Sequence, residues 1–170
     1  VGAIMGSGGL VVLYDADCMV DIARYFLEFT QDQSCGKCTF CRIGTKRMLG
    51  LLERMCAGQA KRKDLDELEH LARQVTQGSL CGLGKTAPNP VLTTLRYFRD
   101  EYEAHIRDRR CPAHQCPALV KFVIDHEKCN GCMLCARQCP AHCILGERQL
   151  PHTIVEEQCT KCGKCFTVCN

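Results

Sequence analysis

The sequence predicts an all-α four-helix bundle followed by a small α+β module, and three observations support this fold class. Four segments between residues 17 and 106 repeat apolar residues with helical periodicity, and short connections join them. The periodicity stops over residues 107–120. Beyond that break, a pattern of four cysteines recurs after 30 residues, and an internal repeat of this kind indicates a duplicated structural unit.

Residues 1–16 are predicted to be the end of a preceding β domain. Glycines at positions 6, 8 and 9 form a turn signal that runs into the apolar segment Leu10–Tyr14, which has the composition of a strand. The turn is not a dinucleotide-binding fingerprint, because the third glycine of the G-x-G-x-x-G pattern is missing and no helix follows at the right place. We therefore expect no nucleotide site here.

The helical domain is predicted over residues 17–106. Asp17 is placed to cap the first helix; the second runs from about Phe40 to Cys56, with Gly58 as its stop signal. The third spans about Asp64 to Gln77, and the fourth begins after Pro90. The residues expected to face inward include Leu27, Ile43, Met48, Leu52, Leu68, Val75, Val91, Leu95, Phe98 and Tyr102.

Cysteine is the compositional outlier, with 17 residues in 170. A disulfide scaffold is disfavoured, because the number is odd and 12 of the cysteines fall into iron–sulfur spacings. We therefore expect a reducing, cytoplasmic setting. No apolar run approaches the roughly 20 residues that span a bilayer, and no secretory signal is visible.

The repeated cysteines predict a bacterial-type ferredoxin domain over residues 121–170. The run from Cys129 to Pro140 has the spacing C-x2-C-x2-C-x3-C-P, in which the fourth cysteine ligates the other cluster. A zinc ribbon would need two pairs of cysteines rather than two fours. The second run ends at Asn170 without the usual proline. The expected ligands of one [4Fe–4S] cluster are Cys129, Cys132, Cys135 and Cys169, and those of the other are Cys159, Cys162, Cys165 and Cys139.

A third [4Fe–4S] site is predicted in the helical domain. Cys35, Cys38 and Cys41 lie where the chain enters the second helix, and a helix N-terminus favours their negative charge. Cys81, in a glycine-rich segment after the third helix, is the natural fourth ligand.

These motifs resemble a known family. The run Ser34-Cys35-Gly36-x-Cys38-x2-Cys41-Arg42-x-Gly44, followed by Leu80-Cys81-Gly82-x-Gly84, resembles the iron–sulfur domain of the NADH-oxidising flavoprotein subunit of respiratory complex I over about residues 1–105. In that family a four-helix bundle holds the [4Fe–4S] cluster nearest the FMN. The ferredoxin extension and residues 86–98 are similar instead to the beta subunit of NAD(P)-linked, often electron-bifurcating [FeFe]-hydrogenases, and to related NAD-dependent formate dehydrogenase subunits.

The resemblance implies a function. It implies that this segment of an NAD(P)-linked oxidoreductase relays single electrons between FMN and partner clusters or soluble ferredoxin. The FMN and NAD(P) sites of the family have no counterpart in this sequence, and no catalytic residue is expected. The implied partners are other subunits of the complex, including a [2Fe–2S] subunit and a catalytic iron–sulfur subunit, and neither nucleic acid nor a membrane.

The remaining cysteines predict a zinc site in a hinge at residues 107–120. Cys111, His114 and Cys116 have metal-ligand spacing, and Cys56 is the candidate fourth ligand. Unligated thiols beside a surface histidine, or a fourth cluster, are the alternatives. Cys18 and Cys143 are expected to pack as small core residues, and His105 to lie on a solvated helix face.

A zinc-rich structural or nucleic-acid-binding module is the rival function. The formal net charge of +3 invites a nucleic-acid partner. However, each [4Fe–4S] core with four thiolates carries about −2, so three clusters bring the total to about −3. The basic residues thus offset the cluster charge, which disfavours phosphate binding.

Overall fold

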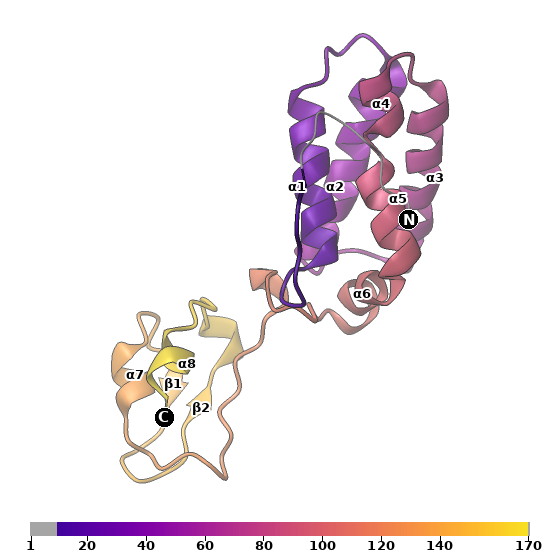
Figure 1. Cartoon of the computed structure of the whole chain (residues 1–170). Coiled ribbons are helices and arrows are strands. Elements are labelled where there is room, and N and C mark those ends of the chain that lie inside the picture. Colours follow the sequence, from indigo (N-terminus) through magenta and orange to yellow (C-terminus); the bar gives the residue numbers. More distant parts are fainter. Residues whose placement is uncertain (1–9, 170) are drawn as a thin grey trace. The chain divides into compact units, whose positions relative to one another are not determined.

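The computed structural model describes residues 10–169 and divides the chain into two units, Val1–Leu119 and Val120–Asn170 (Figure 1). Each unit is described by itself. The first contains the α-helices α1 (Met19–Asp32), α2 (Thr45–Cys56), α3 (Arg62–Gly78), α4 (Gly82–Thr86), α5 (Asn89–Tyr97) and α6 (Arg99–Glu103). Its described part also includes π-helical turns over Phe40–Gly44 and Ala104–Asp108, and a 3-10 turn over Pro117–Leu119.

The four longer helices of the first unit share one core. Helix α1 packs against α2 and α5, and α3 packs against the same two helices (Figure 1). Each helix buries an apolar stripe and leaves its charged face in water, as the 3.6-residue period requires. The fully buried side chains include Leu27, Met48, Leu52, Leu68, Val91 and Tyr102. The predicted helix-rich character of this domain is therefore confirmed.

The predicted fourth helix is interrupted. Helix α5 ends at Tyr97, Phe98 adopts non-helical angles of φ −133° and ψ 39°, and α6 restarts at Arg99. Phe98 and Ile43 are 42% and 48% exposed, so their predicted inward positions are wrong. Their apolar character alone did not distinguish a core position from a surface one.

Two further local expectations differ from the structure. Leu10–Leu13 forms no strand, and Leu10 is 87% exposed. A strand is stabilised by hydrogen bonds to a neighbour, and within residues 10–169 the segment pairs with none. The glycine turn lies outside the described residues. The second predicted helix starts with a π-helical turn at Phe40, and α4 was not predicted.

The second unit is small and centred on cysteines. It contains α7 (Leu134–Gln138), α8 (Lys164–Val168), a 3-10 turn at Glu156–Gln158 and two short strands, β1 (Ile144–Leu145) and β2 (Thr153–Ile154). The strands pair antiparallel, with Ile144 opposite Ile154. The small two-stranded sheet agrees with the predicted α+β class. Among its described residues, the buried hydrophobic ones are Cys135, Cys139, Cys143 and Ile144.

This composition of the second core has an energetic consequence. A core with so little aliphatic surface supplies little of the free energy that folding requires, so small modules of this kind depend on bound metal. We therefore expect the folding of this unit to be coupled to what its cysteines bind.

No helix among residues 10–169 is both long enough and apolar enough to cross a bilayer.

Candidate functional site

The ferredoxin-type loops use the same backbone conformation twice. Gly131 and Met133 have φ of +69° and +67°, and their counterparts 30 residues later, Lys161 and Gly163, have +56° and +74°. Glycine adopts such angles without strain. The first repeat has its glycine at the first of the two positions, and the second repeat has its glycine at the second. The shared geometry shows that the sequence repeat is also a structural repeat.

The thiols of the first ferredoxin set, Cys129, Cys132, Cys135 and Cys169, lie close enough to interact. Burial, and then the charges of Cys129, Cys132 and Cys169, raise the pKa of the Cys135 thiol. Such repulsion between four converging thiolates is what a bound cation or cluster relieves. The structure thus brings together the three cysteines of one repeat and the last cysteine of the other.

The second ferredoxin set lines a small cavity. Cys159, Cys162 and Cys165 meet Cys139 from the other repeat around this cavity, and the aromatic ring of Phe122 is also part of its wall. Burial, and then the charges of Cys159 and Cys162, raise the pKa of Cys165. In each of the two sets, three cysteines of one repeat therefore lie near the last cysteine of the other repeat, which is the crosswise arrangement expected from the spacing.

Two residues beside these sets were not predicted as functional. His152 is fully buried, with its Nδ1 3.8 Å and its backbone nitrogen 3.5 Å from the Cys129 sulfur. Cys143 is 2% exposed, and its sulfur lies 3.4 Å from that of Cys139. The repeat itself was the available signal for His152, because its counterpart 30 residues earlier is Phe122 at the other cavity.

The bundle set comprises Cys35, Cys38, Cys41 and Cys81. Cys35 is exposed and Cys38 is half-buried, both in the loop before the π-helical turn, whereas Cys41 within the turn is 5% exposed. Cys81 is the exposed residue that precedes α4. The backbone amides of Gly84 and Leu83 lower the pKa of the Cys81 thiol, which favours the thiolate form that binds iron.

Glycines let the Cys81 segment approach Cys41. A Cβ added to Gly84 would lie 3.3 Å from the Cβ of Cys41, so α4 is seated directly against this cysteine. A Cβ added to Gly78, at the end of α3, would overlap the ring of Phe40. Close backbone approach at these glycines therefore places the two segments of the bundle set side by side.

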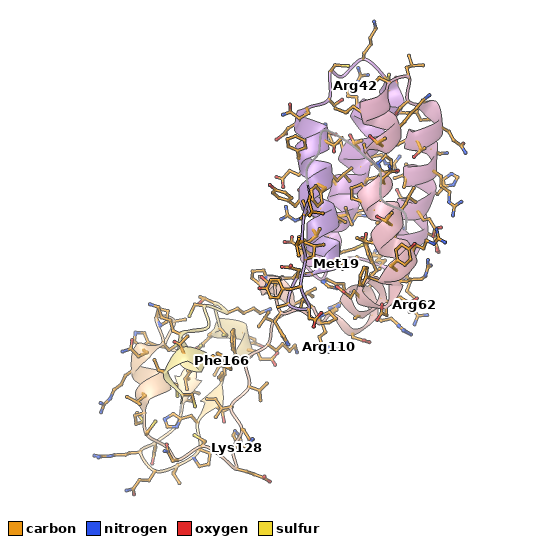
Figure 2. All side chains as sticks on the ribbon, in the orientation of Figure 1. Met19, Arg42, Arg62, Arg110, Lys128 and Phe166 are labelled. Atoms are coloured by element: carbon orange, nitrogen blue, oxygen red, sulfur yellow. The ribbon has the colours of Figure 1, made fainter. Side chains whose placement is uncertain are left out.

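A second group of ligand-type side chains lies at the other end of the first unit. We call it the Cys/His group; its members are Cys18, His105, Cys111 and Cys116, all buried, with ligand atoms all within 4.8 Å of one another. Figure 2 labels Met19, next to Cys18, and Arg42, next to Cys41, at opposite ends of the helices. The Cys/His group is therefore separate from the bundle set.

Hydrogen bonding orients the imidazole of this group. Nδ1 of His105 lies 2.7 Å from the carbonyl oxygen of Glu101, which can only accept a hydrogen, so Nδ1 carries the proton. The lone pair of Nε2 then faces the sulfurs of Cys18 and Cys116 at 3.3 and 3.5 Å. A carbonyl that holds the other ring nitrogen is the usual support of a metal-ligating histidine.

Without a cation, the neighbouring thiols of Cys18 and Cys116 do not both ionise readily. Contact with Cys116 lowers the pKa of Cys18 to about 4, and contacts with Cys18 and Cys56 raise the pKa of Cys116. One thiolate thus suppresses ionisation of its neighbour 3.8 Å away. A bound metal ion would replace the protons and hold both sulfurs as thiolates.

The expected zinc ligands are corrected at two positions. His114 is exposed and lies outside the Cys/His group, and Cys56 is not a member, although contact with Cys116 lowers its pKa. Their places are taken by His105, which is fully buried rather than solvated, and by Cys18. Cys18 is 87 residues from His105 and 98 from Cys116 along the chain, so only tertiary packing reveals the contacts.

The fold and these cysteine sets define an iron–sulfur electron-transfer protein. The family described as the NADH-ubiquinone oxidoreductase-F iron-sulfur binding region matches residues 21–105, and a 4Fe-4S binding domain matches residues 122–145. The chain belongs to the first of these families, and the resemblance inferred from its motifs is confirmed.

Relatives of known name extend the comparison. The chain is 53% identical over 150 residues to the NADP-reducing hydrogenase subunit HndC of Solidesulfovibrio fructosivorans, covering 88% of this chain and 31% of that relative. It is 42% identical over 113 residues to the F 2 subunit of the NADH-quinone oxidoreductase of Rhizobium meliloti (strain 1021), covering 66% of this chain and 27% of the relative. The chain thus spans about a third of the length of these relatives, or less.

A solved structure shares the architecture. A chain of the NAD+-reducing [NiFe]-hydrogenase in the H2-reduced state matches with a TM-score of 0.54 and 32% identity, covering 77% of this chain and 22% of that one.

Proposed function

We propose that this chain is the electron-transfer segment of an NAD(P)-linked flavoprotein subunit in a hydrogenase complex. In this role it relays single electrons between FMN, bound elsewhere in the subunit, and partner clusters or ferredoxin. The observation that carries the proposal is the grouping of twelve cysteines into three sets of four. The 53% identity to a subunit of an NADP-reducing hydrogenase favours a hydrogenase over a formate dehydrogenase.

The three sets fit [4Fe–4S] clusters in number and chemical type. Four thiolates per site are the usual ligands, and bound clusters supply one-electron oxidation and reduction at potentials that the protein adjusts. Each set combines cysteines that are buried or half-buried with at least one exposed member, for example Cys41 with Cys35 and Cys135 with Cys132. The buried cysteines anchor each site, and the exposed ones keep it near the surface, where a partner subunit can dock.

The Cys/His group fits zinc. A tetrahedral site with Zn–S bonds of about 2.3 Å and Zn–N bonds of about 2.0 Å places sulfurs about 3.8 Å apart, and sulfur about 3.5 Å from nitrogen. The structure has 3.8 Å between Cys18 and Cys116, and 3.3 and 3.5 Å from these sulfurs to His105. Four protein ligands leave no open position, so we propose a structural zinc that fastens Cys111 and Cys116 to the start of α1.

The reducing setting follows from the same residues. All 17 cysteines are free thiols in the structure, and an oxidising compartment would compete with ligation by forming disulfides. We therefore propose a cytoplasmic location for the parent enzyme.

Metal analysis with electron paramagnetic resonance (EPR) tests the proposal. Anaerobically prepared protein should contain about twelve iron, twelve acid-labile sulfide and one zinc per chain, with interacting [4Fe–4S] signals on reduction. About eight iron atoms per chain would support clusters at the two ferredoxin-type sets and exclude a cluster at the bundle set. Zinc without iron would overturn the assignment in favour of a zinc-rich structural module.

A further inference from the structure

One buried hydroxyl of the first unit lacks a partner. Ser79, which follows α3, is 2% exposed, and its Oγ is the buried side-chain oxygen or nitrogen that has no hydrogen bond among the described residues. Leaving such a group unsatisfied is costly because its desolvation is not compensated, so native proteins rarely do so without a ligand or ion at hand.

The hydroxyl lies beside the bundle set. A Cβ on Gly84 would be 2.6 Å from the Ser79 Oγ and 3.3 Å from the Cβ of Cys41. The serine and the buried cysteine therefore flank the same glycine. Ser79 is also two residues before Cys81 in the sequence, so it is near a second expected iron ligand along the chain.

A second serine contacts the same cysteine. The Oγ of Ser34 lies 3.3 Å from the sulfur of Cys41 and accepts a hydrogen bond from the backbone amide of Gly36, also at 3.3 Å. Once Cys41 is bound to iron as a thiolate it has no hydrogen to donate, so Ser34 is the donor. The chain has three serines in 170 residues, and two of them flank this site.

We infer that Ser34 and Ser79 both donate hydrogen bonds to the bundle cluster, Ser34 to the Cys41 sulfur and Ser79 to a cluster sulfide, and thereby raise its reduction potential. The inference rests on the proposed function, because it presumes that the bundle set holds a [4Fe–4S] cluster. Reduction adds one electron whose charge is shared by the sulfurs, so donors aimed at them stabilise the reduced state more than the oxidised state. Both serines act through the cluster and are positioning residues.

The test uses Ser79→Ala and Ser34→Ala in the anaerobically prepared, iron-loaded chain. Potentials are measured by EPR-monitored redox titration, and the bundle signal is identified by its loss in Cys38→Ala. Each alanine variant should make this cluster harder to reduce. A tenfold fall in the ratio of reduced to oxidised cluster, measured at a fixed applied potential, corresponds to a decrease of about 59 mV in the reduction potential of the cluster.

Matched variants isolate the hydroxyl effect. Thr76→Val removes a hydroxyl from the last turn of α3, where it is bonded to the carbonyl of Ala72 at 3.0 Å, and should leave the potential unchanged. Ser79→Thr keeps a hydroxyl and should keep the wild-type potential. Electron–nuclear double resonance (ENDOR) after exchange into D2O should show that each alanine variant has lost one exchangeable proton coupled to the cluster.

Two results would overturn the inference. One is an unchanged potential with all exchangeable couplings retained in both alanine variants. The other is an equal shift in Thr76→Val, which would mean that the potential responds to general loosening of α3. If Ser79→Ala loses its iron, Ser34→Ala still decides the inference. Failure of the proposed function is distinguishable, because the wild-type chain would then itself lack the bundle signal and carry about eight iron.

Discussion

Replacing one sulfur of the Cys/His group should release the zinc that we propose there and lower the stability of the first unit. The informative substitution is Cys116→Ser, because this sulfur contacts both Cys18 and His105. Cys56→Ser is the matched control, since Cys56 contacts Cys116 but lies outside the group. A serine at position 56 should leave the zinc content at one per chain.

The expected magnitude follows from the spacing of the charges. Two thiolates 3.8 Å apart would repel each other by about 4 kcal/mol at an effective dielectric constant of about 20, so both sulfurs are held as thiolates only when a metal ion binds them. Loss of an outer-shell partner alone weakens metal binding about 10–100-fold, so loss of a ligand should exceed that range. A 100-fold loss corresponds to about 2.7 kcal/mol, or about 10 °C in the midpoint of unfolding.

The assay combines zinc analysis with thermal unfolding of anaerobic samples followed by helical circular dichroism. Cys116→Ser should hold less than one zinc and unfold at least about 10 °C below wild type, and a zinc chelator should bring the wild-type protein to the same midpoint. A Cys116→Ser variant that keeps one zinc and the wild-type midpoint would refute the reasoning. Equal losses in Cys56→Ser would show that the thiols act only by packing.

Two further substitutions test the cluster sites, and a third is a control. Gly84→Ala places a methyl group 2.6 Å from Ser79 and should remove about four of the twelve iron atoms that we propose for the chain, measured by iron analysis. Gly50→Ala, inside α2 with no atom within 4 Å of the added Cβ, should keep all the iron and raise unfolding stability by about 0.5–1 kcal/mol. His152→Phe, which copies Phe122 of the other repeat, removes a ring nitrogen near Cys129 and should lower the potential of the first ferredoxin set in a redox titration. An unchanged potential would exclude His152 as a donor.

Much of the fold was predictable because its signals are local. Helical periodicity identified the segments that became α1, α2, α3 and α5, since each must bury an apolar stripe. The break at Phe98 was not predictable in this way, because an apolar residue at a helix end satisfies the same pattern whether it is buried or exposed. The segment from Leu10 was assigned as a strand on composition, and composition does not supply a pairing partner.

The sequence by itself determined the iron–sulfur character of the chain, because three of the four cysteines of each expected site are close together along the chain and have a diagnostic spacing. Tertiary structure alone decided the rest. His105 joins Cys18 and Cys116 only after α1 and the segment following α6 have packed together. Ser79 and Cys41 lie against the same face of α4 only because Gly84 lets this helix approach them closely. Contacts between segments far apart in the chain depend on how the helices pack, and residues that meet only through packing show no characteristic spacing in the sequence.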